Sequence, residues 1–189
     1  MSFERIVKIP KDRVAVLIGK KGKIKFEIEN KCNVRINIDS ESGDIIILSK
    51  AKPLFEIESL KAIEIVSAIS KGFSPQRAYK LLEEEVILQI IDLKDFAGKS
   101  LNSMERIKGR IIGAKGKSRK TIEELSGAYI SVYGHSVGII GKFEEIKLAV
   151  NAITMIAKGS AHKSVYSFMQ NARRKAKINK MLLWENEHH

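Results

Sequence analysis

The stretch Leu17-Ile18-Gly19-Lys20-Lys21-Gly22-Lys23 returns 94 positions later as Ile111-Ile112-Gly113-Ala114-Lys115-Gly116-Lys117. The repeat continues without a gap, because Ile28-Glu29 aligns with Ile122-Glu123 and two later pairs of apolar residues also stay in register. A single Gly-x-x-Gly is most often a tight turn. A motif repeated together with its flanking bases and its downstream elements is much harder to explain by chance. The sequence therefore predicts two tandem copies of one small domain.

Hydrophobic patterning predicts the same order of elements in both copies: strand, helix, Gly-x-x-Gly, helix, strand, strand and helix. Asp12 in the first copy and Ser100 or Ser103 in the second are expected helix caps, and Ser74-Pro75 is expected to start a connecting helix. The first copy is expected to have a strand at 5–9, helices at 12–18 and 23–31, strands at 34–38 and 45–48, and a helix at 53–70, before a connecting helix at 76–85. The second is expected to have a strand at 86–93, helices at 100–112 and 117–126, strands at 129–133 and 137–140, and a helix at 143–158, before a last helix at 160–180. We expect an α/β (α+β) protein with domains at residues 1–72 and 86–158, a helical connector at 73–85, and a basic C-terminal helix and tail at 159–189.

Positive charge is concentrated near the repeated motifs. The 189 residues carry 34 Lys and Arg against 22 Asp and Glu, a formal net charge of +12. Three segments without any acid, residues 13–26, 106–122 and 146–184, hold most of the bases, and the rest of the chain is mildly acidic. One basic run alone is most often a solvated surface. Three in a small chain, two of them around the glycine motifs, favour a polyanionic partner.

The sequence excludes several other classes of protein. One cysteine, Cys32, allows no internal disulfide and no cysteine-rich zinc site, and His135 and His162 lie far apart with no cysteine nearby, so no metal or other cofactor is expected. No apolar run approaches the roughly 18 residues that span a bilayer, and the N-terminus has no signal-peptide pattern. We therefore expect a cytoplasmic monomer without membrane contact. The P-loop and Rossmann patterns do not match in register, and no catalytic pair or triad is present, so a non-enzymatic protein is expected.

The glycine motifs have the chemistry of a phosphate-binding loop. Glycine lets the backbone come close to a phosphate, and Gly22 and Gly116 stand before helices, whose free amides and dipole favour an anion. Nearby lysines add an attraction that falls with salt. The candidate binding residues are Arg13, Ile18, Gly19, Lys20, Lys21, Gly22 and Lys23 in the first copy, Arg110, Ile112, Gly113, Ala114, Lys115, Gly116, Lys117, Ser118 and Arg119 in the second, and Arg173 and Arg174 in the C-terminal helix.

The order of elements around Ile18–Lys23 and Ile112–Lys117 resembles the KH domain in its eukaryotic-type (type I) arrangement. This resemblance implies, in each copy, a three-stranded antiparallel sheet packed on three helices and a groove that clamps about four nucleotides of a single strand. Residues 106–120, 130–134 and 162–168 are similar to the archaeal and eukaryotic two-KH ribosome-assembly factors of the "partner of Nob" family. That similarity implies binding of single-stranded RNA, namely small-subunit 16S-type rRNA near its 3′ end, during processing and assembly. It also implies contact with the endonuclease that matures this end and with other assembly or initiation factors.

Two other functions stay open. The chain is alternatively a protein-interaction scaffold in ribosome assembly or translation initiation, docking partners through its acidic part and the apolar stripe Val165–Met169, with one or both grooves vestigial. Salt-dependent RNA binding without any partner would separate the two functions. The second alternative is a catalytic RNA-processing subunit, although the sequence offers no clustered carboxylates to bind magnesium. Eukaryotic members of the family lack a proper motif in the first copy, whereas this chain keeps one at Gly19–Gly22, so the resemblance leaves the role of the first copy open.

Overall fold

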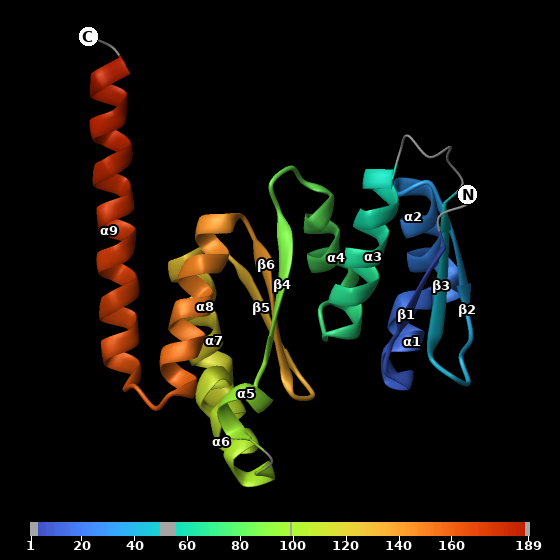
Figure 1. The fold of residues 1–189 in the computed structure, drawn as a ribbon, viewed down its shortest axis with the longest axis horizontal. Helices are drawn as coiled ribbons and strands as arrows, with labels where there is room; N and C mark the ends of the chain where they lie inside the picture. Colours follow the sequence, from blue (N-terminus) through green and yellow to red (C-terminus); the bar gives the residue numbers. More distant parts are fainter. Residues whose placement is uncertain (1–3, 50–55, 99, 188–189) are drawn as a thin grey trace. The chain divides into compact units, whose positions relative to one another are not determined.

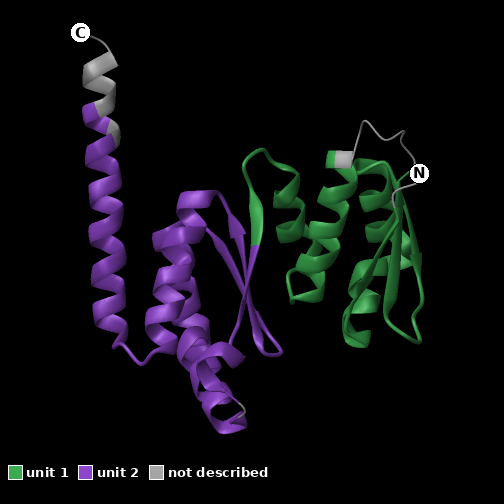
Figure 2. Cartoon of the chain, viewed as in Figure 1, with its two compact units in different colours: residues 1–88 green, residues 89–189 purple. Residues whose placement is uncertain are grey.

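A computed structural model of the protein describes residues 4–49, 56–98 and 100–187 (Figure 1). The chain forms two compact units, residues 1–88 and residues 89–189 (Figure 2). The elements of the first unit are β1 (Glu4–Lys8), α1 (Lys11–Ile18), α2 (Lys23–Lys31), β2 (Val34–Ile38), β3 (Asp44–Ser49), α3 (Glu56–Ser70) and α4 (Pro75–Ala78). Strand β4 (Ile87–Asp92) leads into the second, which continues with α5 (Lys94–Ala97), α6 (Leu101–Ile112), α7 (Lys117–Ser126), β5 (Tyr129–Tyr133), β6 (Ser136–Gly141), α8 (Phe143–Ala157) and α9 (His162–Glu187).

Each unit contains one three-stranded sheet. The strand order is β1-β3-β2 in the first unit and β4-β6-β5 in the second, so the strand that comes last in sequence lies in the middle of both sheets. The antiparallel pairing sets Ile36 opposite Ile47 in the first sheet and Ile130 opposite Ile139 in the second. The expected fold class, with two three-stranded antiparallel sheets packed on helices, is confirmed.

Helices cover one face of each sheet, and in the first sheet the strands present apolar side chains to that face in alternate positions. In β2, Val34 and Ile36 are fully buried while Arg35 and Asn37 are exposed. Leu17 of α1 and Ile28 of α2 are also fully buried, and so are Ile111 and Ile122, their counterparts in the repeat. The sequence repeat is therefore a repeat of the core.

A glutamate of the repeat holds each sheet to the helix before it. Glu29 Oε1 on α2 accepts a hydrogen bond of 2.7 Å from the backbone amide of Ile36 in β2. Glu123 Oε1 on α7 accepts one of the same length from the amide of Ile130 in β5. A charged acceptor makes a strong bond to a backbone amide, so these two residues fix the direction in which α2 and α7 leave the glycine motifs.

Most element boundaries agree with those predicted from the sequence. Pro10 rather than Asp12 occupies the cap position of α1, without a side-chain bond, whereas Ser100 caps α6 as expected by accepting from the Ser103 amide at 3.3 Å. The expected start of α3 at residues 53–55 lies outside the described residues.

The connecting helix is shorter than predicted. The Ser74 cap is confirmed, but α4 passes into a 3₁₀ turn at Tyr79–Leu82, and the prediction of helix through Glu85 is wrong. Ala78 and Leu81 are fully buried in the first unit, so the chain must turn after them to enter β4, and Glu85 takes a positive φ of 62° to do so.

The short helix α5 was not expected, and α9 extends beyond its predicted end at residue 180. Within the described ranges, no helix combines the length and the apolar composition that crossing a bilayer requires.

Candidate nucleic-acid interface

The two glycine motifs have almost the same backbone. Gly19 and Gly113 have φ, ψ of 71°, 176° and 71°, 175°. Lys21 and Lys115 both take the left-handed conformation, with φ of 54° and 51°. In each unit a 3₁₀ turn, Lys20–Gly22 or Ala114–Gly116, separates the two helices. We call these segments, Gly19–Gly22 and Gly113–Gly116, loop 1 and loop 2.

The first glycine of each loop allows two helices to pack closely. A Cβ atom on Gly113 would lie 2.7 Å from Ser118 Cβ and 2.8 Å from Ser118 N, and one on Gly19 would overlap the side chain of Ile24. Atoms this close cannot coexist without a shift of the backbone. The first glycine is therefore a packing residue between α6 and α7, and between α1 and α2.

The second glycine of each loop faces open space. A Cβ atom on Gly22 would have no heavy atom within 4 Å, and one on Gly116 would meet only Arg119 Nη2 at 4.0 Å. Both residues hold the N-terminal cap position of the following helix, α2 or α7, with no side-chain cap. The amides of Lys23 and Lys117, the first residues of these helices, donate to Lys20 O and Ala114 O in the 3₁₀ turns. The positive end of the helix dipole favours an anion at both helix starts. A phosphate can approach the backbone here because no side chain stands in the way.

Exposed lysines surround both loops. Lys20 and Lys21 in loop 1, and Lys115 with Lys117 at loop 2, are exposed and make no ion pair with any residue of the described ranges. Lys23 is also exposed, at 3.8 Å from Glu27. Ala114 is exposed at the tip of loop 2, and Ile18 and Ile112 are half-buried at the ends of the helices that lead into the loops. The expected cluster of glycine backbone, lysine and apolar wall is thus present in each unit.

The structure gives Arg13 and Arg110 a different environment from the loops. Arg13 donates to the carbonyl oxygens of Ile69 at 2.8 Å and Phe73 at 2.6 Å, at the end of α3. Arg110 donates to Ile156 O at 2.6 Å and to Ser160 O, at the end of α8. The two arginines do not align in the sequence repeat, yet both bind carbonyl oxygens at a helix C-terminus, where a positive charge is favourable.

Loop 2 differs from loop 1 in the polar groups behind it. Ser118 is 4% exposed, and its Oγ and the Nε of Arg119 are buried with no hydrogen-bond partner. Their counterparts in the repeat are Ile24, which is apolar, and Lys25, whose ammonium lies 4.0 Å from Glu29. Unpaired buried polar atoms cost free energy, and among the two loops only loop 2 carries them.

Arg173 and Arg174 lie on a different element from loop 2. Both are exposed on α9, and Arg173 donates to the carbonyl of Glu124 at 3.2 Å, in the last turns of α7. Loop 2 lies at the start of α7, roughly 10 Å away along the helix axis. Their assignment as binding residues stays a prediction.

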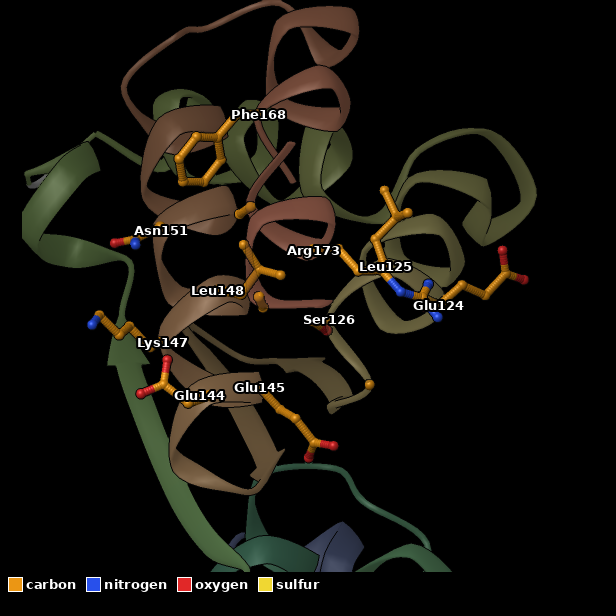
Figure 3. Close-up of a pocket in the computed structure, with 13 residues that line it drawn as sticks. Glu124, Leu125, Ser126, Glu144, Glu145, Lys147, Leu148, Asn151, Phe168 and Arg173 are labelled. Atoms are coloured by element: carbon orange, nitrogen blue, oxygen red, sulfur yellow. The ribbon is translucent and has the colours of Figure 1, made fainter. Parts of the chain in front are cut away.

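A pocket lies at this far end of α7, between α7, α8 and α9 (Figure 3). Its volume is about 420 Å³. Leu125, Leu148 and Phe168 form an apolar wall, and the charged lining residues include Glu124 and Glu144. Val165 and Met169 are fully buried in the core of the second unit, so most of the apolar stripe expected as a docking surface is core. Only Phe168, 37% exposed, faces the pocket.

The two histidines and the cysteine that the sequence singled out have partners or burial that explain them without a metal ion. His135 Nδ1 lies 3.0 Å from Asp92 Oδ1, and His162 Nε2 lies 2.8 Å from the carbonyl of Arg110. The parts of the chain that the structure describes contain no group of three His, Cys, Asp or Glu side chains arranged to hold a metal ion. Burial raises the pKa of the Cys32 thiol to about 11, so Cys32 is a neutral core residue near pH 7.

Comparisons with known proteins agree with this geometry. Residues 87–174 match a family model described as a eukaryotic type KH domain (KH-domain type I), and residues 4–59 match the KH domain model. A KH domain-containing protein of Methanocaldococcus jannaschii is 44% identical over 182 residues, which are 96% of this chain and 79% of that protein. The pre-rRNA-processing protein pno1 of Schizosaccharomyces pombe is 30% identical over 145 residues, and this aligned region covers 76% of this chain and 59% of that relative.

A solved structure with the same fold contains RNA. It is the a/eIF2alpha-aDim2p-rRNA complex of Pyrococcus horikoshii, in which the matching chain is 47% identical, with a TM-score of 0.85, over 92% of this chain and 96% of that one. This chain therefore belongs to the PNO1/Dim2 family of KH-domain, RNA-binding pre-rRNA-processing proteins.

Proposed function

We propose that the chain binds single-stranded rRNA near the 3′ end of the small-subunit rRNA, through loop 1 and loop 2, and that it acts there in processing and assembly of the small subunit. The observation that carries the proposal is the shared geometry of the loops, in which Gly22 and Gly116 leave open space in front of a helix N-terminus. The rRNA in the complex of the Pyrococcus relative supports the same ligand class.

Loop 2 is the stronger of the two RNA contacts in this proposal. Arg119 Nε and Ser118 Oγ are buried beside loop 2 without a hydrogen-bond partner. A phosphate oxygen at the start of α7 would offer these two groups an acceptor. A guanidinium also binds a phosphate in a fixed geometry that an ammonium cannot match. Loop 1 has Lys25 at the equivalent position, already close to Glu29. Loop 1 is then a weaker, mainly electrostatic contact.

The proposed role is binding without catalysis, carried out in the cytoplasm by a single chain, because one chain supplies both loops. A relative is found in a complex with the initiation-factor subunit a/eIF2alpha. We propose an initiation factor of that kind and the rRNA-maturing endonuclease as protein partners. If the chain were itself the nuclease, the purified protein would cleave the 3′-end RNA when magnesium is added.

The test of the loop assignment is a charge reversal at the tip of loop 2. Ala114→Asp with Lys115→Asp puts two carboxylates beside the bound phosphate and removes one cation, without touching a buried residue. We expect affinity for a 16S-type 3′-end fragment to fall by about tenfold to a hundredfold, and its salt dependence to become less steep. The corresponding variant in loop 1, Lys20→Asp with Lys21→Asp, changes the charge by −4 rather than −3 and should still weaken binding less.

Two outcomes would count against the proposal in different ways. An unchanged affinity in both double variants would mean that RNA binds elsewhere on the chain. An absence of salt-dependent RNA binding by the unmodified protein would favour the alternative function, a scaffold that binds only proteins.

A further inference from the structure

A groove in the first unit lies apart from loop 1. It has a volume of about 570 Å³ and is formed by the end of α2, the start of the described part of α3, and the chain that follows the 3₁₀ turn. Its lining residues are Lys31, Ile57, Glu58, Lys61, Leu82, Glu83, Glu84 and Glu85. The proposed RNA contacts at the loops do not involve this groove.

One large apolar side chain is exposed in the groove, and a second is exposed beside it on α3. Ile57, which lines it, is 76% exposed, and Leu60, one turn further along α3, is 49% exposed. Residues three apart on a helix are neighbours on its surface, so these two side chains form one apolar strip. Apolar strips beside a groove are typical of surfaces that bind another molecule.

The charge of the groove is opposite to that of the chain as a whole. Four glutamates line it against two lysines, in a protein of net charge +12. Both lysines have partners on their own unit, because Lys31 Nζ lies 5.0 Å above the ring of Tyr79 and Lys61 Nζ donates to Val86 O at 2.9 Å.

Two of the four carboxylates are available to a ligand. Those of Glu58 and Glu84 make no hydrogen bond or ion pair with any residue that the structure describes. Such a surface repels phosphates and attracts cations, which makes RNA an unfavourable occupant and a basic polypeptide a favourable one.

We propose that this groove binds a basic protein segment in which lysines or arginines stand on both sides of one apolar side chain. The apolar side chain packs against Ile57 and Leu60, and the flanking cations pair with Glu58 and Glu84. Such a partner would hold the protein through the first unit while the loops hold RNA, and this binding does not depend on the RNA assignment.

The probe is a short peptide with one leucine flanked by lysines and arginines, titrated into the full-length chain by calorimetry, with amide chemical shifts recorded by NMR. We expect saturable binding, with shifts at Ile57–Lys61 and Leu82–Glu85. Replacing the peptide leucine by alanine should weaken binding several-fold, because the apolar contact is lost. Replacing its bases by glutamates should abolish binding.

Variants of the protein separate this groove from general charge attraction. Glu58→Lys with Glu84→Lys should weaken peptide binding by about tenfold or more, whereas Glu41→Lys with Glu144→Lys, a control that changes two exposed glutamates outside the groove, should leave most of the affinity. Equal effects of the two pairs, or indifference to the peptide leucine, would overturn the proposal. So would self-association of the unmodified chain that the peptide reverses, because the occupant would then be a second copy.

Discussion

The first glycine of loop 2 is predicted to stabilise the fold rather than to contact RNA. In Gly113→Ala, the new Cβ would lie 2.7 Å from Ser118 Cβ and 2.8 Å from Ser118 N. The residue would also keep φ, ψ of 71°, 175°, a region that residues other than glycine hardly populate. The backbone strain costs about 1–3 kcal/mol and the overlap about as much again, so the unfolding free energy should fall by about 2–6 kcal/mol.

The assay is thermal and urea unfolding of the full chain, with hydrogen exchange of the α7 amides to report on the second unit. For a unit of about 100 residues, even the lower bound corresponds to a fall in Tm of about 10 °C. Gly109→Ala is the matched control, because Gly109 lies inside α6 and a Cβ there meets no heavy atom within 4 Å.

The control variant should be more stable than the unmodified protein by about 0.5–1 kcal/mol, since glycine is unfavourable within a helix. The reasoning would be refuted if Gly113→Ala unfolded at the same temperature as the unmodified chain or as Gly109→Ala.

Three further predictions concern residues away from the loop tips. Arg110→Met removes two charged hydrogen bonds to the end of α8, and should lower the unfolding free energy measured in urea by about 1.5–3 kcal/mol; a loss of RNA affinity at unchanged stability would contradict this role. Glu123→Ala leaves the buried amide of Ile130 without its acceptor and should destabilise the second unit by about 1–3 kcal/mol in the same measurement. Glu29→Ala should destabilise the first unit by a similar amount, and an unchanged unfolding free energy in both variants would contradict the role of these glutamates. Because the pKa of Cys32 is raised from 9.0 to about 11, the neutral thiol favours the folded state below pH 9, and this contribution is lost as the pH rises through 11. Iodoacetamide should therefore alkylate Cys32 near pH 8 only as fast as the first unit opens, and fast labelling of the folded chain would exclude a buried thiol.

The sequence was sufficient to locate both loops, because their glycines are required by local backbone geometry and recur with a constant spacing. It was also sufficient for the strands at Val34–Ile38 and Tyr129–Tyr133, where alternation of apolar residues reports burial directly. The helix predicted through Glu85 failed because the turn into β4 depends on where Ala78 and Leu81 are buried, which local patterning does not contain.

The directions of side chains were harder to predict than the elements. Arg13 and Arg110 stand in basic segments beside the loops, but their guanidinium groups reach helix ends that lie 46 to 60 residues away in sequence. Ser118 follows loop 2 in sequence and is one of the candidate binding residues, yet the close approach of α6 and α7 at Gly113 buries it. The groove at Glu58 and Glu84 joins two segments that no sequence pattern connects, and only the fold brings them together.

The most direct test of the central claim is an NMR titration of the ¹⁵N-labelled chain with a single-stranded 16S-type 3′-end RNA. The account predicts that the largest amide shifts occur at Lys115–Lys117 in the second unit, with smaller shifts at Lys21–Lys23 in the first, and that both sets diminish as salt is raised. RNA binding that leaves these amides unchanged, with shifts confined to α9 or to the sheets, would contradict it.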